Sequence, residues 1–140
     1  IADEPTPGLD EAAVEETINN LIQLKEKGIG MILITHDIYT AINTSDRIAI
    51  LYLGYVIEIT DTKNFSGEGE KLLHPYTRSL LSAIPLPDPM YEKKRQRIVY
   101  NPLAAHDYSK EGPKLREITP GHFVYCNSAE FARYQKELKK

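Results

Sequence analysis

The feature that most constrains the fold is a short apolar segment that follows an amphipathic helix. Apolar side chains recur at helical spacing across residues 11–27, so this stretch predicts one helix with an apolar face. Asp10 is a good N-cap for that helix, and Gly28 is a natural residue just beyond its end. Residues 29–35 are then almost continuously apolar, which is typical of a strand covered on both faces. This order favours an α/β fold.

Elements on both sides of this segment extend the pattern. Residues 1–2 predict the end of a buried strand, and Asp37 predicts the N-cap of a short helix. Residues 47–53 and 55–59 predict two strands around a tight turn at Gly54. The predicted order is therefore strand, helix, strand, short helix and hairpin, which is an α/β arrangement.

The chain after this hairpin is less regular. Residues 60–70 are polar and rich in glycine and serine, so they predict a loop. Residues 72–84 predict a helix that is interrupted near Pro75. Three prolines between residues 85 and 89 then break regular structure and mark the expected linker.

Beyond the linker we expect a small α+β tail, so that residues 1–85 form one domain and residues 86–140 another. The predicted elements of the tail are a strand at residues 96–100, a hairpin of strands at 115–118 and 122–126, and a final helix that begins after Asn127 in a capping-box pattern with Glu130. Its candidate core consists of Ile98, Val99, Leu115, Ile118, Phe123, Val124, Phe131, Tyr134 and Leu138. A core of this size is marginal, so the tail is expected to pack against residues 1–85 or another chain.

Charge is unevenly distributed along the chain. Residues 1–60 carry ten acidic and three basic side chains, a net charge of −7, whereas residues 91–140 carry six acidic and eleven basic ones, a net charge of +5. The basic residues are scattered apart from a cluster at 93–97, and no nucleic-acid-binding motif accompanies them. Two ordinary solvated surfaces explain this distribution better than nucleic-acid binding does, so no nucleic-acid partner is expected.

Polar residues suited to phosphate chemistry follow the two apolar strands. Asp3 can hold Mg²⁺ through its water shell, and Glu4 can orient and polarise an attacking water. His36 can donate a hydrogen bond to a γ-phosphate. These residues also have simpler explanations. Asp3 and Glu4 can be two acids that begin a turn, and His36 can be a histidine that packs beside a helix start. Asp10, which follows the acid pair, can simply be the N-cap of its helix.

The combination of these residues resembles the second half of an ATP-binding-cassette (ABC) ATPase. Asp3 and Glu4 match the end of its Walker B segment, Asp10 its D-loop and His36 its switch histidine. The resemblance implies the C-terminal half of a P-loop ABC ATPase domain. It also implies that Glu4 and His36 are catalytic, that Asp3, Asp10 and His36 contribute to the ATP site, and that Asp3 is the Mg²⁺ residue through water.

A narrower resemblance lies downstream of the hairpin. Residues 73–78, Leu73-His74-Pro75-Tyr76-Thr77-Arg78, are similar to the extension of ATPase subunits from oligopeptide and dipeptide importers. Taken alone, they are also explained by a proline-interrupted helix that simply packs. The resemblance implies a peripheral subunit on the cytoplasmic face of the membrane that hydrolyses ATP to energise import of peptides or similar small solutes. Its implied partners are a second ATPase subunit, two membrane permease subunits and an extracytoplasmic solute-binding protein.

Parts of the family pattern are missing from these residues. Many relatives carry a cysteine cluster in the tail, but only Cys126 is present here, so no iron–sulfur cluster is expected. No Gly-x-x-x-x-Gly-Lys-Ser/Thr segment or Leu-Ser-Gly-Gly signature occurs, and Pro7-Gly8 departs from the usual D-loop. We therefore expect a C-terminal fragment that is inactive alone, because ATP and Mg²⁺ binding both need the missing half. An apolar sheet edge at residues 32–35 is expected to be exposed.

Two rival functions remain open. One is a soluble ABC-type ATPase of DNA repair or translation, but residues 74–77 and the linker with its tail argue against it. The other is a non-enzymatic interaction or regulatory module in residues 91–140, where a basic hairpin and helix dock a partner.

Overall fold

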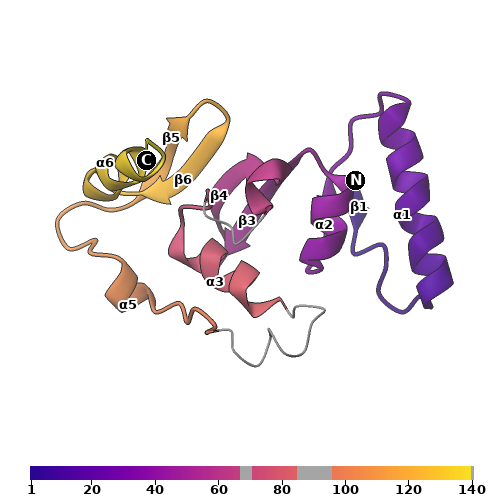
Figure 1. Ribbon diagram of the computed structural model, residues 1–140, viewed down its shortest axis with the longest axis horizontal. Coiled ribbons are helices and arrows are strands. Elements are labelled where there is room, and N and C mark those ends of the chain that lie inside the picture. The colour runs from indigo at the N-terminus through magenta and orange to yellow at the C-terminus, as the bar shows by residue number, and fades with distance from the viewer. Residues whose placement is uncertain (67–70, 85–95, 140) are drawn as a thin grey trace. The chain divides into compact units, whose positions relative to one another are not determined.

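The computed structural model describes residues 1–66, 71–84 and 96–139 (Figure 1). Within them the chain forms two units, Ile1–Ile48 and Ala49–Lys140. The expected proline linker and most of the basic cluster lie outside the described residues, and the domain boundary after residue 85 stays a prediction. No helix in the described ranges is long and apolar enough to cross a membrane.

The first unit owes its helices to local capping. Its elements are β1 (Ala2–Asp3), α1 (Glu11–Glu26), β2 (Leu33–Ile34) and α2 (Ile38–Thr44). The predicted helix and its cap are confirmed, since the Asp10 carboxylate accepts a hydrogen bond from the Ala13 amide at 2.9 Å. Asp37 caps α2 in the same way, accepting from the Tyr39 amide at 3.0 Å.

The apolar segment before His36 differs from its prediction. Only two of its residues form a strand, β2, which pairs in parallel with β1. Ile32 and Ile34 are 61% and 49% exposed, so the strand is not covered on both faces. Apolar side chains are buried only where other elements supply a second layer, and in the described part of this unit none covers them. The exposure agrees with the expected apolar edge.

A four-stranded antiparallel sheet organises the rest of the chain. The elements are β3 (Arg47–Tyr52), β4 (Tyr55–Asp61), the 3₁₀ helix η1 (Thr62–Phe65), α3 (Pro75–Ala83), α5 (Pro102–Ala105), β5 (Lys114–Thr119), β6 (His122–Cys126) and α6 (Ser128–Glu137). The strand order is β3-β4-β6-β5 (Figure 1). Leu53 and Gly54 both have positive φ angles, 47° and 83°, which suits a two-residue hairpin turn between β3 and β4. With both units described, the chain is a mixed α/β protein.

Three local predictions in this region were wrong. Within the loop expected at residues 60–70, residues 60–65 instead belong to β4, which continues to Asp61, and to η1, which buries Phe65, whereas residues 67–70 lie outside the described residues. The helix after residue 72 is not interrupted, because it starts at Pro75, where a missing amide proton costs nothing. Residues 96–100 form no strand, and the short helix α5 follows instead.

The tail packs on the sheet through fewer residues than predicted. Its core joins Ile118, Val124 and Tyr134 to Leu73 and Cys126, with Phe131 and Leu138 packed against them. Ile98, Val99 and Leu115 were predicted in this core but are 51%, 86% and 42% exposed. Cys126 is a free thiol that is fully buried, and burial raises its pKa to about 11.

A buried carboxyl group ties the tail to the middle of the chain. Glu58 in β4 has no exposed surface, and its oxygens accept from the amides of Leu73 at 2.8 Å and His74 at 3.1 Å. The Nε2 atom of His122 in β6 lies 2.7 Å from the same group. Since β4 also pairs with β6, the tail leans on the residues before it, as expected.

Candidate functional site

Two parallel strands bring the predicted site residues to one edge. Ala2 pairs with Leu33, and the Ala2 amide donates to the Ile32 carbonyl at 2.9 Å. The next bond of this ladder runs from the Glu4 amide to the Ile34 carbonyl at 2.8 Å. Because the strands are parallel, the residues that follow them leave the sheet at the same end.

Glu4 and His36 meet at this end. The His36 Nδ1 atom lies 2.9 Å and 3.0 Å from the two oxygens of the Glu4 carboxylate. The His36 amide also donates to one of these oxygens at 3.0 Å. The carboxylate therefore fixes both the ring and the backbone of the histidine, although the two residues are 32 positions apart in the chain.

The electrostatics of this pair follow from its exposure. The hydrogen bond to Glu4, and then the negative charge of Glu4, raise the pKa of His36 above its ordinary value of 6.5. The His36 side chain is 80% exposed and the Glu4 side chain 37%, so water screens the pair and it contributes little to stability. Glu4 also has a φ angle of 45°, a left-handed conformation that non-glycine residues rarely adopt. Such backbone strain is concentrated at functional sites.

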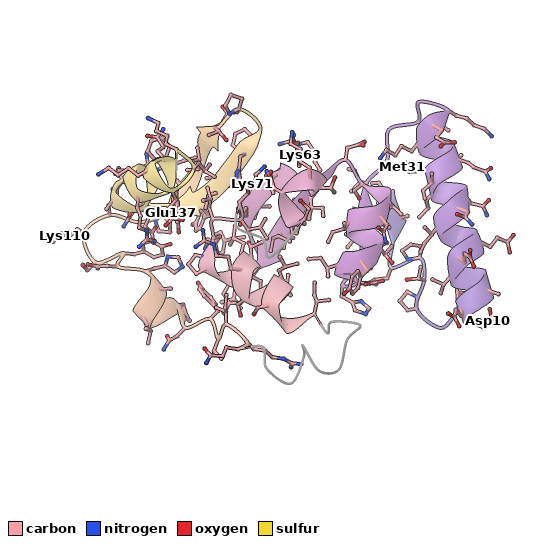
Figure 2. The ribbon with its side chains drawn as sticks, in the orientation of Figure 1. Asp10, Met31, Lys63, Lys71, Lys110 and Glu137 are labelled. Atoms are coloured by element: carbon pink, nitrogen blue, oxygen red, sulfur yellow. The ribbon has the colours of Figure 1, made fainter. Side chains whose placement is uncertain are left out.

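The other two predicted site residues do not join this contact. Asp3 is exposed at the end of β1, and its carboxylate has no hydrogen-bond partner among the described residues. Asp10 lies at the start of α1, where Figure 2 labels it. Its carboxylate caps that helix, so the simpler role considered for it from the sequence is confirmed. A second role for Asp10 stays a prediction.

Sequence reasoning missed a group of buried ionisable residues in the second unit. Besides Glu58 and His122, the unit buries His106 beside Glu130, with Nδ1 and Oε1 2.5 Å apart. His74 is also buried. One signal was available, since Glu58 is the only acid between apolar neighbours in β4. The other residues are far apart in sequence, and only the fold brings them together.

These features define a mixed α/β chain with an acid–histidine pair at the ends of parallel strands. The relatives of this chain are ATP-binding proteins of transport systems. The chain is 42% identical over 139 residues, 99% of its length, to the oligopeptide transport ATP-binding protein OppF of Streptococcus pyogenes serotype M1. It is 43% identical, again over 99% of its length, to the oligopeptide transport ATP-binding protein AmiF of Streptococcus pneumoniae serotype 4. The dipeptide transport ATP-binding protein DppF of Lactococcus lactis subsp. cremoris is 39% identical over 97% of this chain.

The resemblance to ATP-binding subunits of oligopeptide and dipeptide importers is thus confirmed by homologues along nearly the whole chain. The chain spans about 44% of the length of the first two relatives and 42% of the third. No protein-family model matches it.

Proposed function

We propose that the chain is part of an ATP-hydrolysing subunit that energises import of peptides or similar small solutes from the cytoplasmic face of a membrane. The names of its relatives support ATP binding and peptide transport. The observation that carries the catalytic part is the contact between Glu4 and His36 at the ends of two parallel strands. This contact joins a carboxylate and an imidazole, two groups that enzymes use in phosphoryl transfer, from residues that are far apart in the sequence.

In this proposal Glu4 orients the attacking water and accepts its proton. His36 presents its other ring nitrogen, Nε2, to the γ-phosphate, because Nδ1 is held by Glu4. The raised pKa of His36 increases the fraction of protonated ring near neutral pH, and a charged donor binds a phosphate oxygen more strongly. Glu4 thus acts both on water and through the histidine that it orients.

Asp3 is the residue that fits Mg²⁺. Its exposed carboxylate follows β1 directly and is not engaged by any described residue, and hard cations prefer oxygen ligands of this kind. When bound with ATP, Mg²⁺ neutralises charge on the phosphates. Asp10 is proposed to contribute to the ATP site and to its coupling with a second ATPase subunit. The further partners in this proposal are two membrane permease subunits and a solute-binding protein.

The finer fold assignment belongs to the same proposal. We assign residues 1–85 to the C-terminal part of a P-loop ABC ATPase domain, with β1, α1 and β2 as its strand-helix-strand segment, and residues 86–140 to the extension typical of oligopeptide transporters. The 140 residues alone are proposed to be inactive, because they contain no glycine-rich loop whose amides cradle phosphates.

A glutamine in place of Glu4 tests this function in a full-length subunit that contains these residues. Glu4→Gln keeps the size of the side chain but removes the charge that favours proton transfer, so ATP turnover is expected to fall by about 10²–10⁴-fold while nucleotide binding persists. The matched control is Glu16→Gln on the exposed face of α1, which removes the same charge without touching His36. Turnover within about twofold of wild type in Glu4→Gln would assign Glu4 to the turn alone.

A further inference from the structure

Five tyrosines surround a pocket in the second unit: Tyr52, Tyr55, Tyr100, Tyr108 and Tyr125. Several of these rings contact one another. Tyr55 stacks on Tyr125 with centroids 5.4 Å apart, and Tyr100 meets Tyr52 edge-on at 5.5 Å. Such offset and edge-to-face arrangements are the favourable ones for aromatic rings, so the tyrosines hold each other in place and form walls.

The pocket runs from an exposed mouth to a buried floor. Leu53 and Tyr55 at its mouth are 80% and 59% exposed, whereas Ile57 and His74 are only 3% and 2% exposed. Its volume is about 170 Å³. Pockets that bind drug-sized ligands measure about 300–1,000 Å³, so this pocket has room for one ring or side chain but not for a nucleotide.

The lining chemistry selects a neutral ligand. None of the described residues that line the pocket is a lysine, arginine, aspartate or glutamate. An anionic ligand would therefore lose its hydration at the floor without gaining a partner of opposite charge. A cation would meet tyrosine faces, but the lining offers it no carboxylate. An apolar ring, in contrast, gains contact with tyrosine faces on several sides.

His74 adds one hydrogen-bond donor at the floor. Burial, and then the nearby charge of His106, lower the pKa of His74 to about 4, so the ring is neutral at pH 7. Its Nδ1 atom accepts a hydrogen bond from the Tyr76 amide at 3.2 Å, which places the single ring proton on Nε2. Within the described parts of the chain, no group accepts from this Nε2–H. Among the described residues, the fully enclosed side-chain atoms without a hydrogen-bond partner are Thr77 Oγ1 and His106 Nε2, so the His74 Nε2–H is open to the pocket and an incoming acceptor takes the place of water there.

We propose that this pocket binds the phenol side chain of a tyrosine presented by a partner protein. The ring enters between the tyrosine walls, and its hydroxyl oxygen reaches the floor and accepts from the His74 Nε2–H. The depth of the donor distinguishes this ligand from others. A prolyl ring carries its carbonyl at the backbone, near the mouth, and an organic cation brings no acceptor at all. This binding site does not depend on the proposed ATPase function.

Titrating the 140-residue chain with amino-acid amides, followed by nuclear magnetic resonance, tests the proposal. N-acetyltyrosinamide is expected to shift the backbone amides of Tyr55, Ile57 and Tyr125 saturably, with a dissociation constant on the order of 1 mM for so small a ligand. N-acetylphenylalaninamide lacks only the hydroxyl group, so it leaves the His74 donor unpaired and should bind about tenfold more weakly. The corresponding proline and lysine amides should not saturate.

Two matched variants link the binding to the pocket. Tyr55→Ser removes an exposed ring at the mouth and should weaken N-acetyltyrosinamide binding at least about tenfold. Leu51→Ser changes an exposed apolar residue of β3, 63% exposed, that faces away from Tyr52 and should leave binding unchanged. Unshifted Val124 amides would show that both variants stay folded. Equal binding of the tyrosine and phenylalanine amides, tighter binding of the proline or lysine amide, no saturation, or an unaffected Tyr55→Ser variant would each overturn the proposal.

Discussion

Removing the buried Glu58 carboxyl group should destabilise the second unit strongly. Glu58→Ala leaves the amides of Leu73 and His74 and the ring of His122 without their buried partner. Each of these three buried hydrogen-bonding groups costs about 1–3 kcal/mol when it is left without its partner. We therefore expect the free energy of unfolding to fall by about 3–5 kcal/mol. This is a large share of the 5–15 kcal/mol typical of a domain.

Urea denaturation followed by tyrosine fluorescence measures this loss. Eight of the nine tyrosines follow residue 48 and the chain has no tryptophan, so the signal reports mainly on the second unit. If Glu58→Ala does not fold, Glu58→Gln provides the measurement. Its amide oxygen can keep two partners while its NH₂ group faces the His74 amide, so a loss of about 1–3 kcal/mol is expected.

A surface pair serves as the control for Glu58. Glu137, labelled in Figure 2, lies 2.8 Å from Arg78, and both side chains are more than one-third exposed. Glu137→Gln should therefore cost no more than about 1 kcal/mol. If Glu58→Ala costs less than the Glu137 variant, the carboxyl group does not hold the tail to β4, and the reasoning is refuted.

Three further predictions concern the site and the tail. In a nuclear magnetic resonance titration the pKa of His36 should lie above 6.5, and it should return toward that value in Glu4→Gln. The charged pair with Glu4 is complete below pH 6.5 and is lost as the pH rises through the raised pKa. An unshifted pKa of His36 would contradict the contact. Calorimetry should detect weak or no Mg-ATP binding by the 140-residue chain, and micromolar binding would refute the need for a separate phosphate loop. Phe131→Ala should cost about 1–3 kcal/mol in urea denaturation, less than the ~3–5 kcal/mol of a fully buried ring because Phe131 is only partly buried, with Phe131→Leu as the milder control.

The sheet also changes how the rival interaction module can be tested. Removing residues 91–140 from a longer subunit would take away β6, which pairs with β4, and His122, which contacts Glu58. Such a deletion would unfold the middle of the chain as well as remove a docking surface. Point variants on exposed faces of the tail are therefore the cleaner probe of a docking role.

The candidate site shows where sequence reasoning reached its limit. Asp3, Glu4 and His36 were named from the strand ends that carry them, and parallel pairing of those strands is sufficient to bring Glu4 to His36. The sequence could not show that both oxygens of Glu4 lie close to Nδ1 of His36, because strand pairing does not fix the side-chain conformation. It also could not place Asp10 in any contact beyond its own helix.

Features that depend on neighbours within a few residues were determined by the sequence itself. The helix after Asp10, the turn at Gly54 and the capping box of Asn127 with Glu130 all formed as predicted, since each is stabilised by groups three or four positions apart. The tertiary structure alone decided which apolar segments are covered and which polar ones are buried. Ile32 stays exposed because no second layer covers it in the described part of its unit. Glu58 and His74 are buried because distant segments supply their partners. Burial depends on where the rest of the chain lies, and that information is not local.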